Sequence, residues 1–239
     1  MLIIPLLMLL TQPTKATEPG EEELAYEIRY LYGAINAKVA TGTFVLRPDV
    51  WEGQDVYTAD IYIKVKPLFR LFLLPEYDVT GHFTRPGMNP LHYFCPSGRG
   101  WGECRYTEGE KGVHYWRQFD KMPEPEHFYY PNDGRTMELM SLLYFARMYE
   151  FVQGEAVPVK MLLAGKIYNG NITLVGEDSE RYPGHVAQEL HLEIIGRGLM
   201  EDGSGNLFVV WRDASGTHPV LGMYVPLGKK GTMLVNNCL

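Results

Sequence analysis

The chain has 239 residues, of which 46% are hydrophobic and 21% charged, and a formal net charge of −7 at pH 7. This composition is typical of a globular protein with a sizeable core and excludes a disordered chain. The acidic balance disfavours nucleic acid as a partner, because phosphate binding draws on clustered Lys and Arg. The length fits one large β domain.

The first ten residues, MLIIPLLMLL, are apolar but too short to span a bilayer. Thr14 and Ala16 supply the small residues expected before a cleavage site. We therefore expect a signal peptide at 1–16 and a single domain at 17–239 that is exported to the periplasm and is not transmembrane. The alternative is that the apolar run forms a buried N-terminal strand.

Most of the remaining chain alternates apolar and polar residues, the pattern of β-strands. In 24–32 the apolar residues share one face, and Gly33 then predicts a bulge or a close backbone approach, so that a bent first strand continues through Ile35, Ala37 and Val39. Turn signals such as Asn169-Gly170 separate the segments. About twelve short strands with short turns predict an antiparallel meander. The other expected strands are 43–46, 56–65, 77–84, 91–94, 103–107, 113–119, 157–163, 165–175, 184–195, 206–212, 219–226 and 231–235.

The densest apolar run of the expected mature chain lies between Pro67 and Pro75. The bracketing prolines predict a short helical or irregular piece instead of a central strand. We expect this segment to cap the sheet, with Phe69 and Phe72 as candidate ligand-binding residues.

Cys95 and Cys104 flank a glycine-rich loop between two aromatic runs. In an oxidising compartment this spacing favours a disulfide across the mouth of a hairpin. A metal or redox pair is the alternative, although the spacing matches neither CxxC nor a zinc ribbon. Cys238 is left over and is expected to be a free thiol.

The segment from Phe119 to Asn132 combines prolines with aromatic residues and is expected to be a loop. Tyr129 and Tyr130 are candidates for contact with a carbohydrate or a lipid. The alternative is packing over the end of the helix that follows, with Asp133 or Thr136 as its N-cap.

Residues 132–151, NDGRTMELMSLLYFARMYEF, form a long stretch that cannot be arranged as a strand. At about 100° per residue its apolar side chains surround the axis almost completely, which indicates a buried helix. The predicted fold is therefore mainly β: one antiparallel curved sheet, a half-barrel or incomplete barrel, with one long buried helix at about 136–152 in its concavity.

Arg147 lies among apolar residues of this helix, and a buried charge must be paired. It could anchor a ligand anion, with Tyr144 beside it as a second candidate binding residue. The alternative is an internal salt bridge or hydrogen bonds to carbonyl groups at strand ends.

We find no catalytic or metal-binding motif in the sequence. His185, Glu189, His191 and Glu193 share one strand face, but a solvated sheet face gives the same pattern. The other histidines are scattered, GxSxG is absent, and we expect no metal or cofactor. Four acidic residues near the predicted loop are weak candidates for a carboxylate pair: Asp120, Glu124, Glu126 and Asp133.

Three segments resemble the exported bacterial family known as domain of unknown function 3108. They are Tyr26–Tyr30 with Gly33, the helix Met137–Arg147, and Val210–Asp213 with His218–Val220. The resemblance spans nearly the whole expected mature chain. It implies a YmcC-like β half-barrel with a helix on its concave side in a Gram-negative cell-envelope protein, and it brings no catalytic residues.

The leading functional hypothesis is a non-enzymatic periplasmic protein. It would bind a lipid or glycan component of the envelope on the concave face of the sheet, or contact an envelope assembly protein. The alternative is a hydrolase of envelope polymers that uses the acidic loop and Arg147.

Overall fold

The computed structural model describes residues 20–69, 77–85, 88–97, 100–107, 112–131, 136–163, 165–195, 206–227 and 231–238. Within these ranges the protein is mainly β, as predicted, with one 15-stranded, mostly antiparallel open sheet, one α-helix and a 3₁₀ turn at Pro67–Phe69. No helix in these ranges is long and apolar enough to cross a membrane. The helix is α1 (Leu139–Met148), and the strands are β1 (Glu22–Tyr32), β2 (Ile35–Trp51), β3 (Gln54–Val65), β4 (Tyr77–Thr84), β5 (Pro90–Ser97), β6 (Gly100–Thr107), β7 (Gly112–Phe119), β8 (Glu126–Pro131), β9 (Thr136–Met137), β10 (Ala156–Leu163), β11 (Lys166–Asp178), β12 (Ala187–Ile194), β13 (Leu207–Asp213), β14 (Val220–Pro226) and β15 (Thr232–Asn237).

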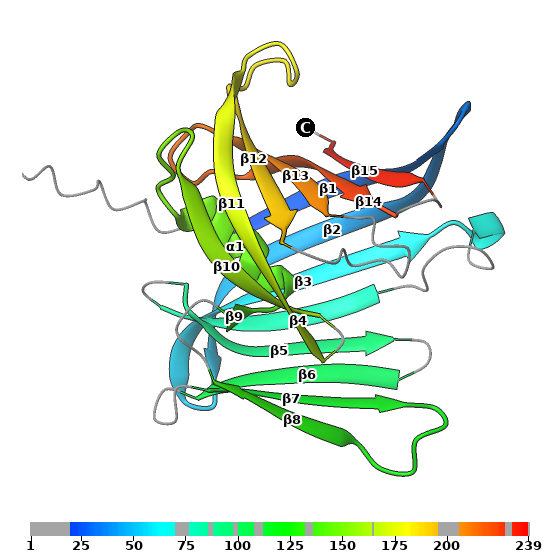
Figure 1. Ribbon diagram of the computed structural model, residues 1–239, viewed down its shortest axis with the longest axis vertical. Coiled ribbons are helices and arrows are strands. Elements are labelled where there is room, and N and C mark those ends of the chain that lie inside the picture. The colour runs from blue at the N-terminus through cyan, green and yellow to red at the C-terminus, as the bar shows by residue number, and fades with distance from the viewer. Residues whose placement is uncertain are drawn as a thin grey trace, which may run out of the picture.

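The sheet consists of two meanders joined in the middle. Its order is β8-β7-β6-β5-β4-β3-β2-β1-β15-β14-β13-β12-β11-β10-β9 (Figure 1). The two meanders meet where β1 pairs with β15, for example through Ile28 and Val235. Only the short β9 pairs in parallel, with β10. Strands β8 and β9 are therefore the two ends of a sheet that does not close.

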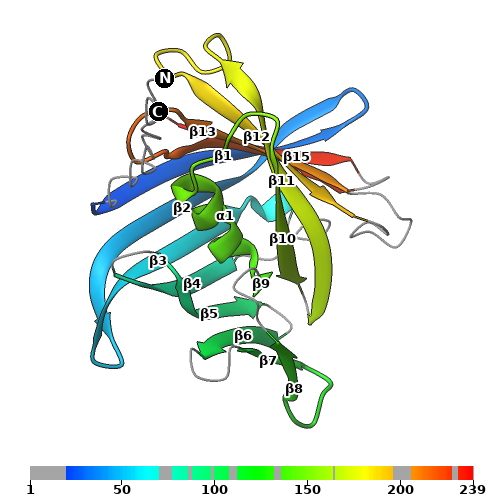
Figure 2. The ribbon, with the colours of Figure 1, turned by 60° about the vertical axis from the view of Figure 1, so that its left-hand side comes forward.

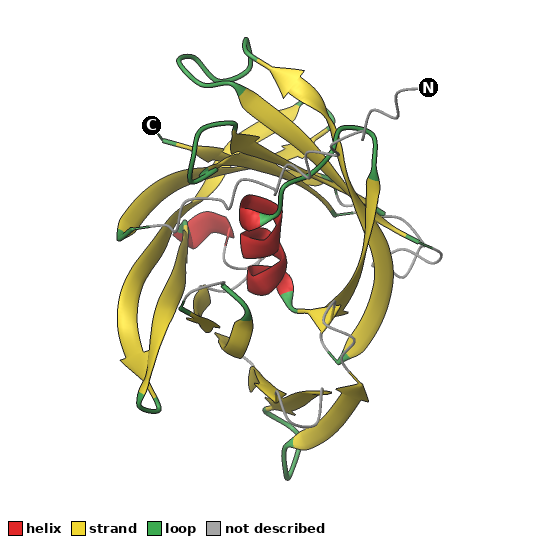
Figure 3. Ribbon diagram, turned by 90° about the vertical axis from the view of Figure 1, so that its left-hand side faces the viewer, coloured by secondary structure: helices red, strands yellow, loops and turns green. Residues whose placement is uncertain are grey.

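The sheet curves around α1, which lies in its concavity (Figures 2 and 3). One side of α1 packs through Leu142, Leu143 and Ala146 into a core shared with β10 to β15 and β1. Met140 and Tyr144 pack into a second core with strands β2 to β4. The helix is thus buried between the two meanders, as its all-round apolarity predicts.

A glycine allows this close packing on β4. A Cβ atom at Gly81 would lie 2.5 Å from the Met140 sulfur. A side chain at this position would force the flexible Met140 side chain to move, so Gly81 leaves the room that Met140 occupies in the core.

The helix is shorter than predicted at both ends. Thr136 and Met137 form β9, and Glu138 is the N-cap, so the proposal of Thr136 as N-cap is wrong; Asp133 lies outside the described residues. The chain leaves the helix at Tyr149 in an extended conformation. Apolar periodicity continues beyond both ends of the helix. Before the helix, however, Thr136 and Met137 pair with β10. After it, the backbone amide of Gly154 donates a hydrogen bond to the Leu174 carbonyl of β11.

Two local predictions on the N-terminal side are also corrected. Gly33, with φ of 54°, lies in the hairpin turn between β1 and β2 and is not a bulge; the register shift is at Ile28 and Arg29. The expected loop before the helix contains β8, which pairs with β7 along its whole length. Alternating burial of Phe128, Tyr129 and Tyr130 is that of a strand, which the flanking prolines obscured.

Side chains join the two ends of the open sheet. Cys104, Val113 and Tyr115 from β6 and β7 form one buried cluster with Leu162 of β10. The Tyr130 hydroxyl donates a hydrogen bond of 2.6 Å to the carbonyl oxygen of Gly165. The sheet is therefore open in its backbone pairing, whereas its interior is partly closed by this seam.

The expected disulfide is absent: Cys95 and Cys104 are both free thiols. In the β5–β6 hairpin Cys95 lies opposite Gly102, and Cys104 lies opposite Tyr93. The two cysteines are thus diagonal neighbours, and such Cα atoms are about 7–8 Å apart, beyond the usual reach of a disulfide. Cys238 is also free, as expected.

Candidate functional site

An apolar cavity of about 560 Å³ lies between α1 and the concave face of the sheet. Its walls come from both meanders and from the helix, with Ile28, Ile63, Leu143, Leu190 and Val235 among them. Helix α1 therefore does not fill the concavity of the sheet. A cavity of this size is in the range that proteins use for small ligands.

Three apolar residues mark where the cavity meets solvent. Phe119, Leu139 and Leu163 line it and are 43%, 46% and 37% exposed, although they are large hydrophobic side chains. They come from β7, α1 and β10, so the opening lies near the seam between the two ends of the sheet. An apolar molecule could reach the interior there without crossing the sheet.

Glu138 is the one charged residue among the described residues that line the cavity. It is 2% exposed, and its carboxylate accepts hydrogen bonds from Met140 N at 2.5 Å and Ser141 N at 2.8 Å, and from the Ser141 hydroxyl. Burial raises the pKa of Glu138 to about 7, against the opposing effect of these hydrogen bonds. The same carboxyl group thus caps the helix and titrates near neutral pH.

Two thiols and a phenol lie in the wall near Glu138. Burial raises the pKa values of Cys95, Cys104 and Tyr93, and the charge of Glu138 raises them further. All three side chains are therefore uncharged at neutral pH. Apart from Glu138, the lining side chains carry no charge at neutral pH and most cannot form hydrogen bonds, which suits an apolar ligand.

Arg147 points away from this cavity and is bound internally. Its guanidinium forms an ion pair with Glu22 of β1, and its Nη2 donates hydrogen bonds to Glu22 at 3.0 Å and to the Thr217 carbonyl at 3.2 Å. It also lies 5.3 Å from the ring centroid of Tyr144. These contacts are the internal pairing that the sequence offered as the alternative to an anion anchor.

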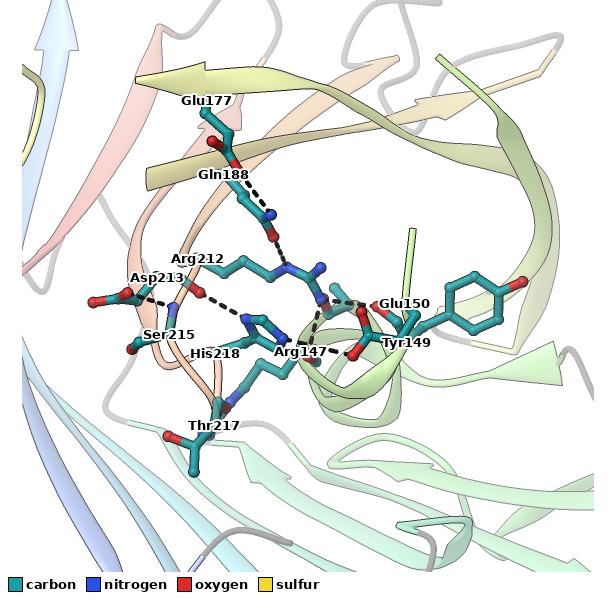
Figure 4. Close-up of polar contacts among 11 residues, drawn as sticks. Arg147, Tyr149, Glu150, Glu177, Gln188, Arg212, Asp213, Ser215, Thr217 and His218 are labelled. Carbon is teal, nitrogen blue, oxygen red and sulfur yellow. Dashed lines mark hydrogen bonds and ion pairs between the residues drawn. The ribbon is translucent and has the colours of Figure 1, made fainter. Parts of the chain in front are cut away.

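A second buried arginine, Arg212 of β13, holds the C-terminal end of the helix (Figure 4). It is 1% exposed, and its Nη1 donates to the carbonyl oxygens of Ala146, Arg147 and Tyr149 at 2.8 to 2.9 Å. Its Nε donates to Gln188 at 2.9 Å. Sequence reasoning missed this residue, although a lone arginine inside the buried run VVWRD was a visible signal.

The remaining candidate residues are dispersed over the structure. Phe69 packs against the main core, Tyr130 lies at the seam, Tyr129 is 45% exposed, and Phe72 is outside the described residues. Glu126 pairs with Arg117 on the last strands of one meander, whereas Arg147 contacts β1. Glu126 and Arg147 therefore have separate partners, and Asp133 lies outside the described residues. Among the described residues no group of three or more His, Cys, Asp or Glu could hold a metal ion.

Comparisons with family models, with curated proteins and with solved structures found no match for this chain.

The ion pair of Arg147 makes a measurable prediction. We expect Arg147→Met to lower the free energy of unfolding by about 2 kcal/mol, since Glu22 keeps a partly exposed side chain that can rehydrate. A double-mutant cycle with Glu22→Gln, followed by urea unfolding, should give a coupling energy of about 1 kcal/mol or more. Additive effects of the two substitutions would show that the pair does not stabilise the fold.

Proposed function

We propose that this protein is an exported, non-enzymatic carrier that binds a single apolar chain, such as the alkyl chain of an envelope lipid, between α1 and the sheet. The observation that carries the proposal is the apolar cavity of about 560 Å³ with an opening lined by exposed apolar residues. Of the two ligand types expected from the sequence, a lipid fits better than a glycan, because these walls offer few partners for sugar hydroxyl groups.

The half-barrel architecture and the relationship to the exported family belong to the same proposal. They are supported by the open, curved sheet with its helix on the concave face. Export to the cell envelope would give such a carrier access to lipids. A protein partner in the envelope remains a prediction from the sequence.

Binding of straight-chain alcohols tests the proposal. We expect them to displace the neutral dye N-phenyl-1-naphthylamine. Their affinity should rise about fourfold for each added methylene, because each buried CH₂ group contributes about 0.8 kcal/mol to the binding free energy. The gain should stop at the chain length that fills the cavity. Native mass spectrometry of the purified protein would show whether one chain binds per protein.

A matched pair of substitutions separates the cavity from the rest of the surface. Ile63→Trp adds a large side chain at a lining position and should lower the affinity at least tenfold. Ile195→Trp makes the same change at a position that is 58% exposed and outside the lining, and should bind as the wild type does. No saturable binding, or equal binding by both variants, would refute the carrier function.

A further inference from the structure

Four histidines that are scattered in the sequence form two pairs on the outer face of the sheet. His82 of β4 lies directly opposite His92 of β5, and their side chains face away from the core, since neighbouring Phe83 packs against Tyr144 of the helix. The two rings are joined by a hydrogen bond between their Nδ1 atoms, which are 3.1 Å apart. His114 and His127 form the second pair on β7 and β8, with Nδ1 and Nε2 3.0 Å apart.

Each pair lies against a tryptophan ring. Trp51 stacks on His82 and on His92, with ring centroids 4.8 and 5.2 Å away. Trp116 stacks in the same way on His114 and His127. The stacking holds the imidazole rings in place, so their nitrogen atoms are positioned before any ligand arrives.

The nitrogen separation in the first pair suits a shared metal ion. Imidazole binds Zn²⁺ with bonds of about 2.0–2.1 Å, and two such bonds meeting at about 90–110° place their nitrogens roughly 2.9–3.4 Å apart. The observed 3.1 Å falls inside this interval. Metal binding replaces the hydrogen bond between the rings: the His82 proton moves from Nδ1 to Nε2, and a small rotation of each ring within the stack directs both Nδ1 lone pairs to one ion.

The outer nitrogen of His92 has the partner that a metal ligand needs. Its Nε2 is 3.0 Å from the carboxylate of Glu103, which Arg105 holds with a hydrogen bond of 2.9 Å. A carboxylate on the far nitrogen fixes the tautomer, leaves Nδ1 as the electron-pair donor and strengthens it.

We propose that His82 and His92 form a binding site for one divalent transition-metal ion of the Zn²⁺, Ni²⁺ or Cu²⁺ class. Imidazole ligands favour these ions over Mg²⁺ and Ca²⁺, which prefer oxygen. The protein supplies two ligands and water supplies the others; among the described residues no group of three or more His, Cys, Asp or Glu could hold a metal ion by itself. The site is on the outer face, so it is separate from the apolar cavity.

Trp51 provides the readout, since bound Ni²⁺ or Cu²⁺ quenches a stacked indole. The full chain would carry His127→Asn, which removes the second pair, and NiCl₂ would be titrated while tryptophan fluorescence is recorded. We expect saturable quenching with one equivalent bound. His92→Asn and, independently, His82→Asn should abolish it, and Glu103→Gln should weaken binding tenfold to a hundredfold.

His191→Asn in the same background is the control, because His191 lies on β12 and pairs with Glu189. It should leave the titration unchanged, and circular dichroism would confirm that each variant is folded. Quenching that persists in folded His82→Asn or His92→Asn, that is equally weakened in His191→Asn, or that MgCl₂ also produces would overturn the site.

Discussion

Replacing Arg212 by methionine is expected to lower the free energy of unfolding by about 3–5 kcal/mol, because three backbone carbonyls lose their donor and each buried acceptor left unsatisfied costs about 1–3 kcal/mol. The guanidinium is almost fully buried and makes no ion pair in the contacts described; it is held by three backbone carbonyls at the end of α1 and by Gln188. Those carbonyls carry the negative end of the helix dipole, which stabilises a cation. Methionine would fill similar space but leave them without these donors.

Lysine at the same position tests whether Arg212 stabilises the fold through its charge and hydrogen bonds or through the space that its side chain fills. Arg212→Lys keeps a cation whose ammonium group has three donors, so it should recover part of the loss, although it loses the contact with Gln188. Thermal or urea unfolding of both variants gives the comparison. If lysine and methionine destabilise the protein equally, the role assigned to the carbonyl contacts is wrong.

Most of the strands were predictable because apolar and polar residues alternate along them, even where both faces are buried, as at Tyr57 to Asp60 in β3. In β3, Tyr57, Ala59 and Ile61 alternate with polar residues, and the structure places the alternating set toward the core. The meander followed from the short turns. The meeting of β1 with β15 could not be read in the same way, because any strand with a suitable apolar face could pair there, and the choice depends on the packing of the whole chain.

The errors have a common cause in register and in competition for backbone hydrogen bonds. The spacing of Cys95 and Cys104 predicts that they lie on one hairpin. Whether they lie opposite each other or diagonally depends on the register of β5 and β6, which the spacing does not give. Met137 fits the helical periodicity, yet its backbone pairs with Met161. The same dependence on register hid the pairing of His82 with His92, which are ten positions apart and look unrelated in the sequence.

The cavity could not be predicted from the sequence either, since it depends on how far α1 stands from the sheet. Two polar residues fix that position. Arg212 holds the carboxyl end of the helix and Glu138 its amino end, where the Glu138 backbone amide also donates to the Tyr106 hydroxyl at 3.0 Å. A helix fixed at both ends can leave space beside it, because the surrounding side chains cannot draw it in to fill the void.

We expect the stability of the protein to fall by about 3 kcal/mol as the pH rises from about 4.5 to 7, through the titration of Glu138 alone. Its pKa is raised by burial from 4.5 to about 7, so the folded state binds this proton more tightly than the unfolded state does. The contribution is fully present below pH 4.5 and is lost once the pH exceeds 7. The magnitude follows from about 1.4 kcal/mol for each tenfold change in proton affinity.

Glu138→Gln isolates this effect, because glutamine has nearly the same shape and no proton to release in this range. Urea unfolding of both proteins from pH 4 to 8 should show their difference in stability moving by about 3 kcal/mol in favour of the variant, mostly between pH 4.5 and 7. Other titrating groups cancel in that difference. A constant difference for Glu138→Gln would mean that the buried carboxyl keeps its ordinary pKa and that the cavity wall is charged at neutral pH.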